Sequence, residues 1–322
     1  MRLRWLAGKA LAALLTLVFV LVFNFFLFRV MGDPTAQLAR LPRATPEEIV
    51  KLRAYYGLDK SLLGQFADYA GDTAKLDLGV SQRSRRTVAA ELRDAIPWTL
   101  LLVGVGTLFA TLLGTWLGVI AATRRGTATD DGLLGFSLFT YAAPEYWIGI
   151  ILILLFAVAL PLFPAGQQVT PGEEFSSWGA HALDIANHMV LPVATVTLML
   201  LGQYFVIMRS SMVDVLTEDF VTVKRATGMP WNRVVRKHAV PNALLPLVTL
   251  AALQFGAVAG GLITIETIFS WPGLGELTYN AINDKDFPVL QGTFLVFSIA
   301  TIAANLIADA LYFVLDPRVK SA

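Results

Sequence analysis

The sequence has 322 residues, of which 56% are hydrophobic and 15% are charged, and its mean hydropathy is +0.62. A soluble domain carries about 25% charged residues, so a single soluble core cannot bury this many apolar side chains. The chain has no Cys, which excludes disulfides, thiolate metal sites and a Cys nucleophile. The net charge of +1 carries no information about nucleic acid or an acidic substrate, and three widely spaced His residues predict no metal site.

Six continuous apolar stretches are long enough to cross a bilayer as helices. A hydrocarbon core about 30 Å thick requires about 20 apolar helical residues. The runs are continuous rather than alternating, which favours helices over barrel strands. The sequence therefore predicts an all-α integral membrane protein with six transmembrane helices. They are Ala10–Met31, Ile96–Thr123, Gly132–Leu162, Met189–Met212, Leu244–Ser270 and Val289–Leu315.

The first stretch follows Arg2, Arg4 and Lys9, as the apolar part of a signal peptide does. It is about 22 residues long, whereas the apolar region of a signal peptide has about 7–15. No small-residue cleavage motif follows it. We expect residues 1–31 to form an uncleaved anchor.

The loop over residues 32–95 has helical signals of its own. Thr45-Pro46-Glu47-Glu48 has the layout of a capping box with Pro at the first helical position, and Gly57 can end that helix. A second amphipathic stretch covers Ser61–Leu76. These signals predict a small helical extracytoplasmic loop; the alternative is a plain tether between two spans.

The distribution of Lys and Arg predicts the orientation. With the N-terminus in the cytoplasm, thirteen Lys and Arg residues lie in cytoplasmic segments, and the two short outer loops hold none and one, Lys285. Cytoplasmic loops carry the excess of positive charge in membrane proteins. Both termini are therefore expected to be cytoplasmic.

The cytoplasmic loop over residues 213–243 is polar but patterned. A predicted helix begins at Asp219-Phe220 and continues through Arg225 and Ala226, and Gly228-Met229-Pro230 breaks it. A second helix follows, with an apolar and a basic face. Its apolar face carries Trp231, Val234, Val235 and His238, and the basic face carries Arg233, Arg236 and Lys237. Two such helices can dock into a groove of a cytoplasmic partner, or their basic face can contact anionic lipid.

Four ionisable residues lie within or beside the apolar stretches: Glu145, Arg209, Glu266 and Asp309. An ionisable group at membrane depth usually faces a cavity or a partner. Arg209 and Asp309 lie near cytoplasmic ends, where snorkelling explains them, so Glu145 and Glu266 are the candidates for a translocation pathway. Two GxxxG motifs, Gly114–Gly118 and Gly256–Gly260, allow close helix packing.

The sequence has no phosphate-binding loop and no hydrolase motif of the HExxH or GxSxG type. No catalytic residue is predicted, and the chain is not expected to be an enzyme. If transport is driven by ATP, the ATPase is another subunit.

The stretch Glu218–Thr249, EDFVTVKRATGMPWNRVVRKHAVPNALLPLVT, resembles the EAA loop of binding-protein-dependent ABC importer permeases, in the form found in the dipeptide and oligopeptide branch. Three further stretches resemble the same branch: Gly57–Ser81, Glu266–Gly292 and Asn305–Lys320. The resemblance covers nearly the whole chain. It implies the type I importer fold, with a core permease domain over residues 96–322.

The resemblance also implies partners and a site. These are a second, similar permease, two cytoplasmic ATPases that bind ATP and Mg, an external solute-binding protein and the lipid of a prokaryotic cytoplasmic membrane. The ATPase-coupling residues it implies are Asp219, Phe220, Arg225, Ala226, Gly228, His238 and Asn242. Trp231, on the apolar face, and Arg236, on the basic face, are predicted coupling residues from their positions in the loop.

Two positions depart from the family pattern. Val223-Lys224 replaces the usual Thr-Ala, and Glu145 replaces a small or apolar residue. The branch includes carriers of peptides, nickel chelates, glutathione and oligosaccharides, so the fold does not define the solute. A secondary transporter or channel is the rival interpretation, although no internal repeat supports it. A membrane enzyme is a second rival, but no catalytic constellation supports it.

Overall fold

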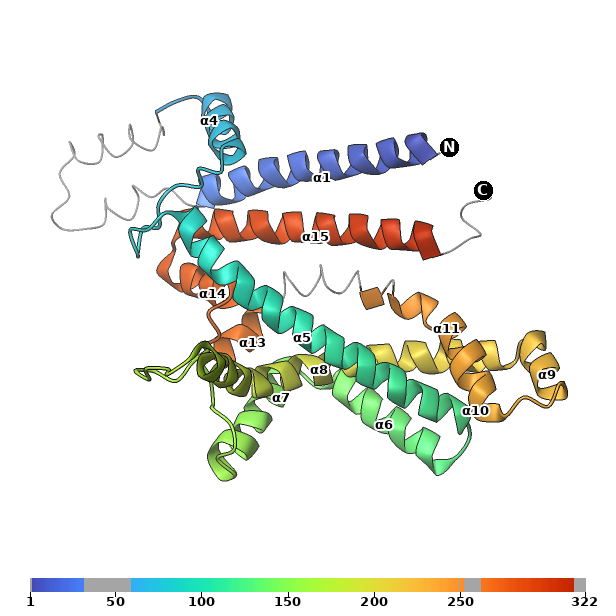
Figure 1. The fold of residues 1–322 in the computed structure, drawn as a ribbon. Helices are drawn as coiled ribbons and strands as arrows, with labels where there is room; N and C mark the ends of the chain where they lie inside the picture. Colours follow the sequence, from blue (N-terminus) through green and yellow to red (C-terminus); the bar gives the residue numbers. More distant parts are fainter. Residues whose placement is uncertain (1, 32–58, 249, 252–261, 316–322) are drawn as a thin grey trace. The chain divides into compact units, whose positions relative to one another are not determined.

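The computed structural model describes residues 2–31, 59–248, 250–251 and 262–315, and it is helical with one isolated bridge between Val80 and Thr87 in the described part (Figure 1). The described residues form two compact units. One contains Met1–Pro97 and Leu277–Ile302, and the other contains Trp98–Glu276 and Ala303–Ala322. The predicted boundaries at residues 31 and 95 stay a prediction.

Among the described residues, four helices are long and apolar enough to cross a membrane, and a bent pair makes a fifth if it counts as one span. The four are α1 (Arg2–Met31), α5 (Val88–Thr123), α8 (Trp178–Leu216) and α15 (Phe287–Leu315). They contain four of the predicted spans. The predicted span Leu244–Ser270 crosses residues outside the described part, so the count of six and the orientation of the termini stay predictions.

The first unit combines α1, α4 (Leu62–Ala74), the start of α5, most of α14 (Leu274–Asp284) and the first half of α15. Phe25 of α1 contacts Phe66 and Tyr69 of α4, with ring centroids 5.4 and 5.7 Å apart. Phe28 packs edge-on against Phe294 of α15 at 5.5 Å. Aromatic contacts thus join three helices that are far apart in sequence.

The helix α4 confirms the amphipathic stretch predicted at Ser61–Leu76. Ser61 is its N-cap and accepts a hydrogen bond from the Gly64 amide at 3.3 Å. The predicted capping box at Thr45–Glu48 and the stop at Gly57 lie outside the described residues.

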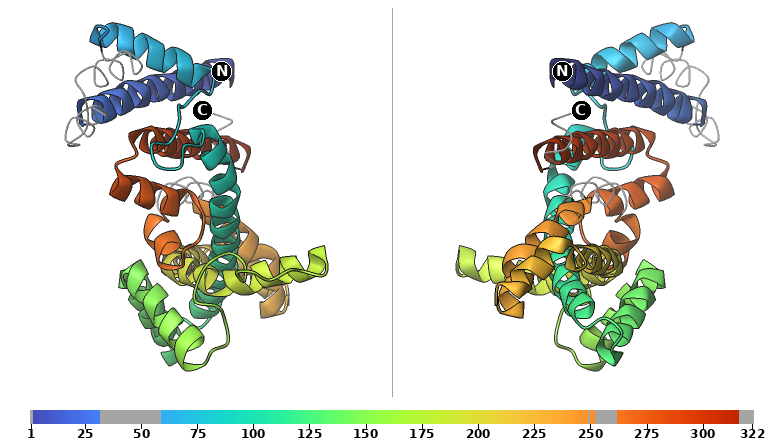
Figure 2. Two further views of the ribbon diagram at one scale, coloured as in Figure 1. Left: turned by 90° about the vertical axis from the view of Figure 1, so that its left-hand side faces the viewer. Right: turned by 90° about the vertical axis from the view of Figure 1, so that its right-hand side faces the viewer.

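The second unit is built around α8, which is the most buried of the four long helices. Four elements of this unit pack on α8, and a fifth, η1, continues α7; Figure 2 shows the ribbon from two sides, and the five are given in chain order. They are α6 (Ala128–Ala142), α7 (Glu145–Ile153), the π-helix η1 (Leu154–Ala159), α11 (Val240–Ala243) and α13 (Ile263–Ile268). The shared core includes Tyr204, Met208 and Met212 of α8.

The predicted span over Gly132–Leu162 is not one straight helix, and whether its two parts cross the membrane as one span stays a prediction. The chain ends α6 at Ala142 and begins α7 at Glu145, and the two axes are bent by 101°. Pro144 causes this break, because it has no N–H to donate and its ring disfavours the helical conformation at Ala143, whose ψ is 134°.

Close packing of α5 on α8 confirms the predicted role of one GxxxG motif. A Cβ on Gly114 would lie 2.6 Å from the Cβ of Tyr204, and one on Gly118 would lie 2.8 Å from the Cβ of Met208. Only hydrogen fits at these two positions. The second motif, Gly256–Gly260, lies outside the described residues.

We predict that Gly114→Ala lowers the thermal unfolding midpoint in detergent, because overpacking costs about 1–3 kcal/mol. Gly135→Ala in α6 is the matched control, since a Cβ there meets nothing within 4 Å. Loss of a helical Gly should stabilise that variant by about 0.5–1 kcal/mol. Equal midpoints for the two variants would contradict close packing at Gly114.

Candidate functional site

The loop over residues 213–243 folds as two short helices separated by a turn, as the sequence predicts. The first helix is α9 (Asp219–Ala226), and the second is α10 (Trp231–Val234). Asp219 lies in the first turn of α9, and Lys224 and Arg225 lie in its last turn. This placement complements the helix dipole, which favours acidic groups at the N-terminus and basic groups at the C-terminus.

The turn depends on Gly228, whose φ is +79°. Its amide donates to the Arg225 carbonyl at 2.9 Å, and the Met229 amide donates to the Lys224 carbonyl at 3.3 Å. These bonds close the C-terminus of α9 in a left-handed cap of the kind that glycine favours. A Cβ at Gly228 would meet nothing within 4 Å, so the constraint is conformational and not steric.

The second helix is not a regular α-helix throughout. After Val234 the chain continues as the π-helix η2 (Val235–Ala239), in which the Val240 amide bonds to the Val235 carbonyl, and then as α11. Val234 is 0% exposed, and Val235 and Ala239 are also buried. Val235 and Ala239 belong to the same core as Met208 and Met212 of α8.

The predicted apolar face is therefore divided. Val234 and Val235 are buried within this chain and are not available to a partner. Val235, the first residue of the π-helix, packs in the core that includes α8. Trp231 is 39% exposed. The other predicted coupling residues are exposed or half-buried in this loop: Asp219, Phe220, Arg225, Ala226, Gly228, Arg236, His238 and Asn242.

Arg225 and Trp231 connect the two helices of the loop. The Arg225 guanidinium lies over the Trp231 ring, with its carbon 5.2 Å from the ring centroid. Such a contact contributes about 0.5–1 kcal/mol at an exposed site. Neither the spacing nor the composition of the loop predicted this stack.

An ion pair joins α6 to α8. Its Arg209 lies in α8, shortly before the loop over residues 213–243. Arg209 Nε and Nη2 donate to the two carboxylate oxygens of Asp130 at 2.6 and 2.7 Å. The Gly126 amide donates to the same carboxylate at 3.0 Å. The Arg209 side chain is 24% exposed, so a fork-to-fork pair accounts for it better than the snorkelling we expected.

Glu266 lies at the centre of a second buried polar cluster and is 0% exposed. One of its carboxylate oxygens accepts from Thr99 Oγ at 2.6 Å, and the other accepts from the Gly275 and Glu276 amides at 2.6 and 3.2 Å. Thr99 Oγ accepts in turn from the Leu274 amide at 2.8 Å. The carboxylate therefore caps the N-terminus of α14, and Thr99, which is 167 residues away from Glu266, joins it there.

Two glycines make room for this cluster. A Cβ on Gly273 would collide with the Glu266 carboxylate and with Thr99 Oγ, and one on Gly275 would lie 2.7 Å from the Ile263 Cα. The stretch from Glu266 to Glu276 thus carries a carboxylate and the two small residues that let backbone amides reach it. The pathway role predicted for Glu266 stays a prediction, since these bonds explain its burial without one.

Glu145 is the first residue of α7 and follows the N-cap Pro144. It is half-buried, and an acidic group in a first turn is stabilised by the helix dipole. Within the described part of the chain no ion pair to Glu145 is found. Its predicted place in a pathway stays a prediction.

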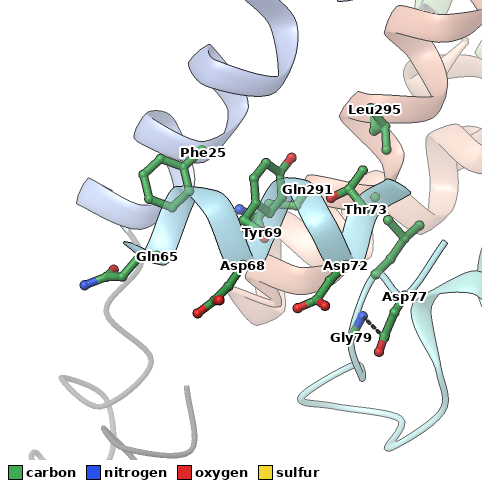
Figure 3. A pocket seen from close by; sticks show the side chains of 12 residues that line it. Phe25, Gln65, Asp68, Tyr69, Asp72, Thr73, Asp77, Gly79, Gln291 and Leu295 are labelled. Carbon is green, nitrogen blue, oxygen red and sulfur yellow. Dashed lines mark hydrogen bonds between the residues drawn. The ribbon is translucent and has the colours of Figure 1, made fainter. Parts of the chain in front are cut away.

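A concave pocket of about 190 Å³ lies within the first unit (Figure 3). Phe25 and Tyr69 form its aromatic wall, and Asp68 and Asp72 project from successive turns of α4. The side-chain amide of Asn24 donates to Tyr69 Oη at 3.2 Å and to the Gln291 carbonyl at 3.0 Å. Across the described residues no group of three or more His, Cys, Asp or Glu is arranged to hold a metal ion.

The membrane-long helices and the two-helix loop are the architecture of a multi-pass membrane protein. The family model described as the inner membrane component of binding-protein-dependent transport systems matches residues 114–321, and a model for the N-terminal part of such components matches residues 2–103. The chain therefore belongs to this family of ABC importer permeases, and it is a multi-pass protein of the prokaryotic cytoplasmic membrane.

Three similar relatives carry different names for their solutes. The dipeptide transport system permease protein DppB of Escherichia coli K12 is 36% identical over 92% of each chain. The oligopeptide transport system permease protein AppB of Bacillus subtilis is 32% identical over 98% of this chain and 99% of its own. The glutathione transport system permease protein GsiC of Escherichia coli O6:H1 is 35% identical over 97% of each chain.

We predict that Thr99→Val destabilises the protein more than Thr99→Ser. Val keeps the shape of Thr but removes both the donor to Glu266 and the acceptor of the Leu274 amide, which should cost about 2–3 kcal/mol. Ser keeps the hydroxyl and loses a methyl group, which costs about 1 kcal/mol. Denaturant unfolding in detergent measures both. If Val is tolerated as well as Ser, the cluster does not stabilise this region.

Proposed function

We propose that this chain is a permease subunit of an ATP-driven, binding-protein-dependent importer of peptides, and that it forms half of the translocation pathway. The observation that carries the proposal is the loop of α9 and α10. Its turn is exposed and basic, while its far end is packed into the core of the same chain. This arrangement suits a loop that receives a movement from a cytoplasmic partner and passes it to the spans.

The working assembly would contain several further chains. A second homologous permease would complete the pathway, two cytoplasmic ABC ATPases would bind ATP and Mg, and an extracytoplasmic solute-binding protein would deliver the solute. Closure of the ATPases on ATP would displace the loops through contacts at Trp231 and Arg236. The spans would then change between inward-facing and outward-facing arrangements as rigid bodies. ATP and the loaded receptor would shift the populations because each prefers one state.

Peptides are the solute we favour, because two of the three relatives carry peptide names. The alternative is the same machinery with another solute, such as a nickel chelate, glutathione or an oligosaccharide. A secondary transporter or channel is a distant second class. Calorimetric titration of the partner receptor with dipeptides, oligopeptides, glutathione and nickel chelates distinguishes these solutes, since the receptor selects the cargo. Tight binding of glutathione and none of peptides would overturn the peptide assignment.

We predict that Gly228→Val leaves the spans inserted but releases the ATPase or uncouples its hydrolysis from uptake. A β-branched residue at this φ costs roughly 1 kcal/mol or more, and relief of that strain changes the angle between α9 and α10. Copurification of the ATPase and receptor-stimulated hydrolysis in reconstituted vesicles measure the effect.

The matched control for Gly228 is Gly126→Val. Gly126 also has a positive φ, +77°, and open space around its missing Cβ, but it lies between α5 and α6. The two variants should be destabilised to a similar degree, and only Gly228→Val should lose coupling severalfold. Wild-type coupling in Gly228→Val would remove Gly228 from the ATPase contact and favour the lipid-facing alternative.

We predict that a Cys at position 59 reacts with an impermeant thiol reagent in intact cells, because residues 32–95 are expected outside. The chain has no Cys of its own, so a single substitution gives a single reactive site. Asp59 is exposed, as is Asn232 in the loop of α9 and α10. Asn232→Cys should react only after lysis. The reverse pattern would invert the proposed orientation.

A further inference from the structure

Four buried side chains recur at every fourth position between the cytoplasmic loop and the segment that follows it. They are Val235, Ala239, Ala243 and Leu247, each at most 6% exposed, and all four belong to the core that includes α8. In a regular α-helix, residues four apart differ by about 40° around the axis, because each residue turns the chain by about 100°. Three such steps sum to about 120° and would carry Leu247 off the face of Val235.

The π-helix η2 offsets part of this drift. Its last carbonyl-to-amide bond joins the Val240 amide to the Val235 carbonyl, five residues back, so one turn contains more residues than an α-helical turn and each residue turns the chain less. The buried side chains therefore stay on one face. They pass from Val235 to Ala239, which is 0% exposed, whereas His238, which the sequence predicts on the apolar face, is half-buried.

Pro241 explains why the chain widens at this point. It is the second residue of α11, and because the chain is helical from Trp231 onward, Pro241 lies inside a longer helical segment. It has no amide hydrogen to donate, and the ring of a Pro inside an α-helix collides with the carbonyl four residues earlier, here that of Lys237. A π-helix occurs mostly as a single turn inside an α-helix, and a wider turn directly before the Pro gives this carbonyl room.

Asn242 closes the same turn with its side chain. Its Nδ2 donates to the His238 carbonyl at 2.7 Å, and the direction of the bond is fixed because a carbonyl only accepts. Asn242 is exposed, while its neighbour Ala243 is buried in the core. In a continuous α-helix the face of Val235 would include the position seven residues later, so Asn242 would turn its amide toward the core. The observed turn avoids that burial of a polar group.

We infer that Pro241 and Asn242 are positioning residues, which hold η2 as a π-helix and thereby set the direction in which the two-helix tip around Gly228 leaves the core. The resemblance places Asn242 among the residues that couple to the ATPase, and the bond to the His238 carbonyl gives it a role within this chain. Pro241 excludes the α-helical alternative, and Asn242 stabilises the turn that remains. The consequence for coupling rests on the proposed importer function, whereas the geometry of the turn does not.

A change of this turn would displace the exposed tip by a large amount. One residue of an α-helix turns the chain by about 100° and advances it by about 1.5 Å. If η2 became α-helical while Ala243 and Leu247 stayed in the core, α10 would rotate about its axis relative to α8. A side chain about 5 Å from the axis moves by up to about 8 Å in such a rotation. Trp231 and Arg236 would then be presented to a partner in a different direction.

A pair of spin labels in the full chain in lipid nanodiscs measures the direction of the tip. The chain has no Cys of its own, so Asn232→Cys in α10 and Ser210→Cys in α8 give one labelled pair at exposed positions. Pro241→Ala restores an amide hydrogen and removes the ring, and it should shift the mean distance between the labels by several ångström. The control is Pro246→Ala, which removes an exposed Pro beyond the turn and should leave the distance unchanged.

Asn242→Ala and Asn242→Ser form a second, matched pair that differs by one hydroxyl group. A Ser hydroxyl on a helix can donate to the carbonyl four residues earlier, which here is that of His238. Asn242→Ala should therefore broaden the distance distribution or shift its mean, and Asn242→Ser should keep the wild-type distribution. Both new side chains are small and the position is exposed, so both variants are expected to fold.

Two results would overturn the inference. One is a wild-type distance distribution in either Pro241→Ala or Asn242→Ala, which would mean that packing on α8 alone holds the turn. The other is an equal change in Asn242→Ala and Asn242→Ser, which would mean that the bond to the His238 carbonyl is not the cause.

These distances need no ATPase, receptor or solute, so a negative result leaves the proposed importer function untouched. In the reconstituted importer, Asn242→Ala should lower the uptake per ATP hydrolysed severalfold relative to Asn242→Ser. Equal coupling in the two variants, with a changed distance only in Asn242→Ala, would overturn the role of the turn in coupling.

Discussion

The scarcity of water in a bilayer is the constraint on which this structure depends. A polar group in hydrocarbon must find its partner inside the protein, because each unsatisfied group costs several kcal/mol. Helices satisfy the backbone in this way. The side chains follow the same rule through pairs that are distant in sequence, Asp130 with Arg209 and Glu266 with Thr99, and Glu266 also accepts from two nearby backbone amides. Each pair fixes the contact between two elements, so the polar groups define which helices pack together and the apolar surface supplies most of the area.

Glycine supplies the second half of that arrangement. Where α5 meets α8, Gly114 and Gly118 let backbones approach, and dispersion contacts replace the hydrophobic effect that lipid cannot provide. At the start of α14, Gly273 and Gly275 have another task, since they clear the space through which amides reach the Glu266 carboxylate. Glycine thus allows close apolar packing at Gly114 and Gly118, and at Gly273 and Gly275 it allows hydrogen bonds to the Glu266 carboxyl group.

Much of the helical pattern could be predicted from sequence, because local signals encode it. The limits of α9, the break at Gly228 and the N-terminal residue of α10 follow from composition and turn chemistry, and the structure has them where they were expected. The break within the predicted span Gly132–Leu162 was missed because hydropathy outweighed Pro144, whose local effect on Ala143 ends the helix. The pairing of Arg209 with Asp130 and of Glu266 with Thr99 could not be predicted, since these partners lie 79 and 167 residues away and no local pattern encodes them. Periodicity also could not predict the π-helix η2, whose Val235 and Ala239 are buried in the core that includes α8.

The burial of Val235 and Ala239 has a mechanical consequence. These side chains are set into the same close-packed core as Met208 and Met212, and protein interiors of this density have low compressibility. A load applied at the exposed turn around Gly228 would therefore be borne by contacts between side chains and not absorbed by bending of a hinge. The two-helix loop is packed in the core at its η2 end and exposed at its Gly228 turn. In the proposed mechanism, a displacement of the turn would therefore be transmitted to α8 through side-chain contacts.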